Sequence, residues 1–213
     1  MKLIAIGLLA TVCFAGGTPG SPQLAPITLF TQYLEPAPKG VVEALQEEVA
    51  SILAPSGIHF EWHSLASAAE VGTAVELAVV TFRGTCDAIA FPQKSTAPPL
   101  ALGFTSVTDG EILPFTTIEC DRTRSFLSAA LLRIPANERP ALFGRALGRI
   151  LAHELYHIFA KTQRHGHGGV AKEAYTVQDL MAEEFELEER EFELLRASPA
   201  YNVLQQPAPL KAW

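Results

Sequence analysis

The stretch LFGRALGRILAHELYHIF, residues 142–159, decides the fold of this chain. Its apolar residues recur every three or four positions, which is the spacing of one buried face of an α-helix. These residues are Leu142, Phe143, Leu147, Ile150, Leu151, Leu155 and Ile158. Gly144 and Gly148 lie one turn apart and would let another element approach the helix closely. The stretch therefore predicts a long core helix, and Asn137 and Pro140 suit its N-cap and first turn.

The same stretch contains the pattern His153-Glu154-Leu155-Tyr156-His157. Residues four apart on a helix lie on one face, so His153 and His157 present two imidazoles to one point. Zinc accepts histidine nitrogen, and a catalytic zinc needs three protein ligands and one open position for water. Glu154 projects about 100° around the helix from His153, where its carboxylate can take a proton from that water. The pattern therefore indicates a Zn²⁺ site with Glu154 as the general base.

An accidental match on a surface helix is the alternative interpretation. It is disfavoured because the motif adjoins the buried apolar face, where two histidines and a glutamate would be costly without a partner. A metal ion is a partner that suits all three side chains.

The third metal ligand must come from a segment that folds back. In an unbroken helix, His165 would lie about 12 Å beyond His157 along the axis and could not share a metal with it. The chain must therefore leave the helix between residues 160 and 164, and the glycines of His165-Gly166-His167-Gly168-Gly169 permit such a turn. We expect His165 to be the third ligand. His167, or a carboxylate from Glu183 or Glu184, remains an alternative, since sites with two histidines and one glutamate are known.

With these residues the sequence resembles the zinc-dependent metallopeptidases of the metzincin type. The resemblance is to divergent exported proteins in which a third histidine follows HExxH after seven residues and Gly-Ile-Met comes next. Here seven residues separate His157 from His165, and Gly169-Val170-Ala171 follows. The likeness covers residues 146–171. It implies that His153, His157 and His165 bind zinc, that Glu154 is the general base, and that peptides or proteins are the substrate.

The chain also departs from the metzincin pattern. That pattern would place glycine at position 160 and histidine at position 163, where this chain has Ala160 and Gln163. Ala171 replaces the methionine of the turn beneath the metal. These departures motivate an alternative function, a secreted zinc-binding or interaction domain of the same fold without proteolysis.

The segments before the motif predict a mixed sheet. Strands are expected at 27–34, 58–65 and 76–82, with a helix at 39–54 and a hairpin of 101–107 with 112–118. The strand at 76–82 is uniformly apolar, which favours a central place. A helix is expected at 124–132. The fold class is thus α+β, a mixed β-sheet backed by helices with a central active-site helix and a C-terminal helix.

The C-terminal helix is expected to run from Thr176 to Arg196, with Asp179 completing a capping box. Its acidic run is expected to be a solvated face. The run consists of Glu183, Glu184, Glu186, Glu188, Glu189, Glu191 and Glu193. Tyr175, just before this helix, could donate to an oxyanion, although a packed tyrosine is the simpler interpretation.

The N-terminus indicates export. Residues 1–15 have the pattern of a signal peptide, with Lys2 before a short apolar run, and residues 16–26 read as a flexible lead-in. Residues 27–213 then form a single metallopeptidase-like domain, secreted or periplasmic, with no stable membrane insertion after signal cleavage. Cys86 and Cys120 are expected to form a disulfide. The net charge of −7 gives no reason to expect a nucleic-acid partner, and no pattern indicates an oligomeric state.

Overall fold

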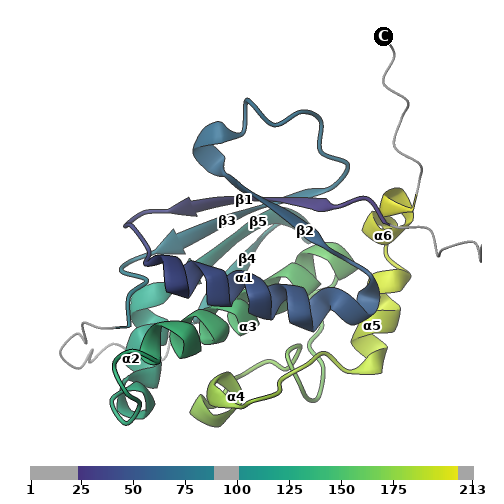
Figure 1. The fold of residues 1–213 in the computed structure, drawn as a ribbon. Coiled ribbons are helices and arrows are strands. Elements are labelled where there is room, and N and C mark those ends of the chain that lie inside the picture. Colours follow the sequence, from purple (N-terminus) through teal and green to yellow (C-terminus); the bar gives the residue numbers. More distant parts are fainter. Residues whose placement is uncertain (1–23, 89–100, 206–213) are drawn as a thin grey trace, which may run out of the picture.

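The structure, a computed structural model, describes residues 24–88 and 101–205 (Figure 1). The predicted signal peptide and most of the predicted lead-in lie outside the described residues. The fold is α+β, a five-stranded mixed sheet backed by helices, as the sequence predicts.

The sheet has the strand order β2-β1-β3-β5-β4. Its strands are β1 (Ile27–Tyr33), β2 (Phe60–Ser64), β3 (Leu77–Arg83), β4 (Gly103–Thr108) and β5 (Glu111–Glu119). Strands β2, β1, β3 and β5 run parallel, and β4 is antiparallel to β5. The apolar strand near residues 76–82 is central, as expected, and the predicted hairpin is β4 with β5. Strand β4 therefore forms one edge of the sheet.

Two long helices, α1 (Lys39–Leu53) and α3 (Arg139–Ala160), lie side by side against one face of the sheet (Figure 1). The predicted glycines make this contact. A Cβ at Gly144 would lie 2.4 Å from the carbonyl oxygen of Val41, and one at Gly148 would lie 2.9 Å from that of Leu45. Larger residues at these positions would push α3, and with it the HExxH motif, away from α1.

The remaining helices are α2 (Cys120–Leu131), α4 (Val177–Met181), α5 (Glu189–Arg196) and α6 (Pro199–Leu204), with short 3₁₀ turns at Ala54–Ser56 and Leu65–Ser67. Two predicted boundaries are wrong. Helix α2 begins at Cys120 instead of residue 124, because β5 runs directly into it. The N-cap of α3 is Glu138 instead of Asn137. Among the described residues, no helix is both long enough and apolar enough to cross a membrane.

The prediction of one continuous helix from Thr176 to Arg196 is also wrong. Thr176 and Asp179 form the expected capping box, but α4 ends at Met181 and α5 starts only at Glu189. Arg149 donates to the carbonyl of Asp179 at 2.7 Å, and Arg145 donates to that of Ala182 at 2.5 Å. These tertiary bonds use carbonyls that a continuing helix would need for its own hydrogen bonds.

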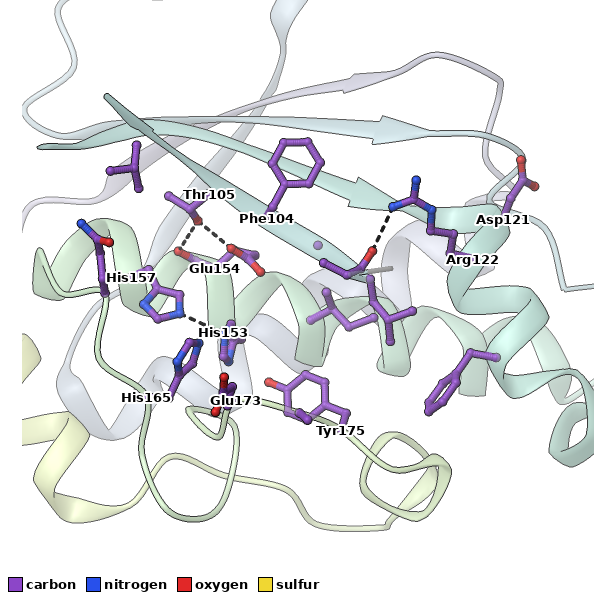
Figure 2. A pocket seen from close by; sticks show the side chains of 18 of the residues that line it. Phe104, Thr105, Asp121, Arg122, His153, Glu154, His157, His165, Glu173 and Tyr175 are labelled. Atoms are coloured by element: carbon purple, nitrogen blue, oxygen red, sulfur yellow. Dashed lines mark hydrogen bonds between the residues drawn. The ribbon is translucent and has the colours of Figure 1, made fainter. Parts of the chain in front are cut away.

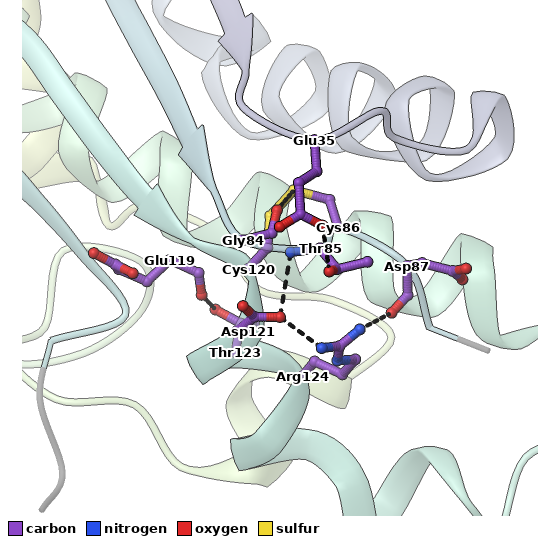
Figure 3. The surroundings of a disulfide bond; sticks show 10 residues. All are labelled: Glu35, Gly84, Thr85, Cys86, Asp87, Glu119, Cys120, Asp121, Thr123 and Arg124. Carbon is purple, nitrogen blue, oxygen red and sulfur yellow. Dashed lines mark hydrogen bonds and ion pairs between the residues drawn. A yellow bond between two sulfur atoms is a disulfide. The ribbon is translucent and has the colours of Figure 1, made fainter. Parts of the chain in front are cut away.

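The predicted disulfide between Cys86 and Cys120 is present, and both residues are fully buried (Figure 3). It joins the segment after β3 to the first residue of α2. The carboxylate of Asp121 supports the same junction, accepting from the backbone N–H of Thr85 at 3.2 Å and from Arg124 at 2.5 Å. The start of α2 is therefore joined to the segment after β3 by one disulfide and by the hydrogen bond from Thr85 to Asp121, while the Arg124–Asp121 contact lies within α2.

Gly144→Ala tests the contact of α1 with α3. The added methyl group would lie 2.4 Å from a backbone oxygen, so we expect the free energy of unfolding to fall by about 1–3 kcal/mol. Gly40→Ala is the control, because a Cβ there meets nothing within 4 Å. It should leave stability unchanged or raise it. Guanidinium denaturation measures both, and equal stability of the two variants would contradict the tight contact.

Candidate metal centre

His153 and His157 lie one turn apart on α3 and face the same cavity (Figure 2). Each is only 8% exposed. Their Nε2 atoms are 3.0 Å apart, and their ring centroids are 4.6 Å apart. The helix thus brings the two imidazoles to one point, as its periodicity requires.

The other nitrogen of each ring fixes its tautomer. Nδ1 of His153 donates to the carbonyl of Val170, and Nδ1 of His157 donates to that of Thr162, both at 2.7 Å. A carbonyl only accepts, so both protons are assigned to Nδ1, and each Nε2 carries a lone pair. Two lone pairs that face one another at 3.0 Å repel unless a cation lies between them.

Both histidines are also held in the neutral form that binds metal. Burial, followed by the charge of His157, lowers the pKa of His153 to about 4. Burial likewise lowers the pKa of His157. Metal binding near neutral pH would therefore not have to displace a proton from either Nε2.

His165 joins them because α3 ends where the motif requires. Lys161 adopts a left-handed conformation with φ of 50°, and the chain turns back. The backbone N–H of Gly166 donates to the carbonyl of Ala171 at 2.8 Å, which closes the loop. Gly169 has φ of +55°, and a Cβ there would lie 2.1 Å from the carbonyl oxygen of Glu186, so the position requires glycine.

The ligand atoms of the three histidines all lie within 4.8 Å of one another. The ring of His165 is 5.2 Å from that of His153 and 4.9 Å from that of His157. In the part of the chain that the structure describes, no other group of histidine, cysteine, aspartate or glutamate is arranged to hold a metal. His167, Glu183 and Glu184, the alternative third ligands, are exposed and lie outside this cluster.

Glu154 is 6% exposed and turns toward the edge strand β4 (Figure 2). The hydroxyl of Thr105 donates to its Oε2 at 2.7 Å. Burial raises the pKa of Glu154 to about 7, and the bond from Thr105 opposes this rise. Gly103 gives the carboxylate room, because a Cβ there would lie 3.2 Å from Oε1. No local pattern indicates Thr105, because its contact with Glu154 joins residues far apart in the sequence.

Tyr175 borders the centre as a packed residue. Its hydroxyl donates to the carbonyl of Val170, the same oxygen that accepts from His153. Its ring lies edge-on to His153 and Phe185, with centroids 5.6 and 5.5 Å away. Burial, and then the charge of Glu154, raise the pKa of Tyr175 well above its ordinary value, so it stays a neutral donor.

The three histidines and Glu154 open into one large cavity of about 1070 Å³. Its walls come from β4, α3, the start of α2 and the segment that carries Tyr175. The apolar part of the wall includes Leu102, Ile150 and Phe126. The cavity is large enough for several residues of a peptide.

The residues present suit zinc. Two nitrogens bound to one tetrahedral zinc at about 2.0–2.1 Å would lie about 3.3 Å apart, and the observed separation of the two Nε2 atoms is 3.0 Å. Three imidazole nitrogens, with water in the fourth position, are the donor set that a catalytic zinc uses.

The sequence matches no protein-family model, and a search of curated proteins finds no significant match. The chemistry of the site therefore rests on its own geometry.

Two single variants test the choice of third ligand. We expect His165→Ala to weaken Zn²⁺ binding by at least about 100-fold, because one of three donor atoms is lost. His167→Ala, two residues away and outside the cluster, should bind Zn²⁺ as the wild type does. Competition titration with a chelating dye measures both affinities. The reverse order of the two variants would assign the third ligand to His167.

Proposed function

We propose that the chain is an exported zinc-dependent peptidase of metzincin-like type. The observation that carries the proposal is that the Nε2 atoms of His153 and His157 lie 3.0 Å apart, with each Nδ1 bonded to a carbonyl, and that His165 completes a set of three donors. The carboxyl of Glu154, on the next residue of the same helix, supplies a base in the same cavity.

The residues divide the chemistry between them. His153, His157 and His165 would hold the zinc, which when bound supplies Lewis acidity toward a water and toward the scissile carbonyl. The Glu154 carboxylate accepts a proton from the attacking water and delivers it to the leaving amine nitrogen. The hydroxyl of Thr105 donates to Oε2 of Glu154. This bond holds the Glu154 carboxyl group beside β4 and restricts its rotation.

The edge strand supports a peptide or protein as the substrate. In the part of the chain that the structure describes, β4 pairs with β5 alone and has no strand along its other edge. Gly103, Thr105 and Val107 of this strand line the cavity. An extended peptide that adds to this edge would make backbone hydrogen bonds along it and pass in front of Glu154.

The disulfide supports the proposal that the protein is exported. Disulfides persist in oxidising compartments, so the Cys86–Cys120 bridge favours a secreted or periplasmic location. The signal-peptide pattern of residues 1–15 points the same way.

A zinc-binding domain without catalysis is the second candidate. It is favoured by Ala160, Gln163 and Ala171, three positions at which the chain departs from the metzincin pattern. Both candidates require the metal, and only the first requires Glu154.

Glu154→Gln separates the candidates. The amide cannot accept the proton of the attacking water, so we expect kcat to fall by about 10²–10⁴-fold while zinc content stays at the wild-type level. A mixed peptide library, analysed by mass spectrometry, provides the substrates. Exposed Glu184→Gln is the matched control and should cleave at the wild-type rate.

The outcomes are distinct. Wild-type protein that holds zinc but cleaves nothing in the library would support the domain without catalysis. Cleavage by Glu154→Gln at the wild-type rate would show that another group is the base.

A further inference from the structure

Glu191 on α5 is a buried carboxylate that the proposed reaction does not use. It belongs to the acidic run that the sequence predicts to be solvated, yet it is 2% exposed. Its Oε2 has no hydrogen-bond partner among the described residues. An ionisable group with an unsatisfied buried oxygen opposes folding, so its presence calls for a role beyond stability.

The carboxylate lies against the residue that follows His165. A Cβ at Gly166 would be 2.8 Å from Oε1 of Glu191 and 3.3 Å from its Cδ. Glu191 therefore occupies the space that a side chain at position 166 would take. The helix that carries it, α5, also packs against α3, which carries His153 and His157.

The imidazole of His165 is held differently from the other two rings. It lies beside the rings of His153 and His157, and among the described residues neither of its nitrogens takes part in a hydrogen bond. The loop that carries it is closed by backbone bonds, from Gly166 to Ala171 and from Val170 to Glu186, both at 2.8 Å. In contrast, His153 and His157 each have a carbonyl partner at 2.7 Å. The position of His165 thus depends on the loop backbone next to Gly166.

We propose that Glu191 is a positioning residue of the metal centre, which holds the loop at Gly166 so that His165 faces His153 and His157. The proposal rests on the metal site of the proposed function and does not depend on peptide cleavage. The carboxylate acts in two ways: it contacts Gly166, and its negative charge, buried beside the loop that carries His165, favours a divalent cation at that ligand.

Zinc titration of Glu191→Gln and Glu191→Ala tests the proposal. Mutation of a residue that orients a metal ligand typically lowers metal affinity by about 10–100-fold. We therefore expect the Kd for Zn²⁺ to rise about tenfold in Glu191→Gln and further in Glu191→Ala. Exposed Glu193→Gln, two residues along α5, is the matched control and should bind as the wild type does. In Co²⁺-substituted protein, the visible absorption of Glu191→Ala should shift as His165 leaves the metal.

Thermal unfolding of the metal-free protein separates positioning from a structural role. Because Glu191→Gln removes an unsatisfied buried carboxylate, its metal-free Tm should equal or exceed that of the wild type. A merely structural glutamate would lower the metal-free Tm and the affinity together. Weaker zinc binding without loss of metal-free stability is therefore the expected signature.

A pair of variants at the contact provides a second test. Gly166→Ala places a methyl group 2.8 Å from Oε1 of Glu191, and it should weaken zinc binding. Gly166 has no positive φ, so the backbone itself accepts alanine. In the double variant Gly166→Ala/Glu191→Ala the two methyl groups share the space, and part of the lost affinity should return.

A Kd of Glu191→Gln within about twofold of the wild type, or additive losses in the double variant, would overturn the proposal. Wild-type protein that binds zinc but cleaves no peptide would contradict the peptidase alone. Wild-type protein that binds no zinc would overturn both.

Discussion

The proposed metal centre depends on two hydrogen bonds from histidine Nδ1 atoms to backbone carbonyls. The acceptors, Val170 and Thr162, both belong to the loop that leaves α3 after Ala160. If α3 continued, the carbonyl of Thr162 would serve the helix and could not reach the ring of His157. The end of the helix at Lys161 therefore does two things, since it returns His165 to the motif and decides which nitrogens of the other two rings carry lone pairs.

The surroundings of α3 hold the rest of the site from two sides. On one side, Gly144 and Gly148 bring the backbone of α1 into contact. On the other, β4 approaches so closely that Gly103 has no room for a Cβ, which would lie 2.8 Å from Ile150. Thr105 of the same strand can then reach Glu154. The position of the carboxyl group is thus a consequence of how α3 packs between α1 and the sheet edge.

The sequence predicts what local periodicity determines. It placed the strands, α1, α3 and the turn back to His165, because each follows from residue spacing or from helix geometry. It missed Thr105, which is 49 residues from Glu154. The sequence also predicted α4 and α5 as one helix. The bonds that interrupt this helix come from Arg145 and Arg149 of α3, which are distant in sequence. Once the helix is broken, the face of α5 is no longer set by the register of α4, and Glu191, expected in solvent, is buried.

Ala171, at the position where the metzincin pattern has methionine, is tightly packed. Ala171 is fully buried, and its Cβ would lie 3.3 Å from a Cβ at Gly166, whose N–H bonds to the Ala171 carbonyl. Gly166 is therefore confined between Ala171 and the carboxylate of Glu191. Because Ala171 is fully buried, a methionine at 171 would need space that neighbouring atoms already fill, and those atoms would have to move. The small residue at 171 is thus compatible with the cluster of three histidines. The loop is closed by its own backbone hydrogen bonds, and Gly166 packs against Glu191 of α5.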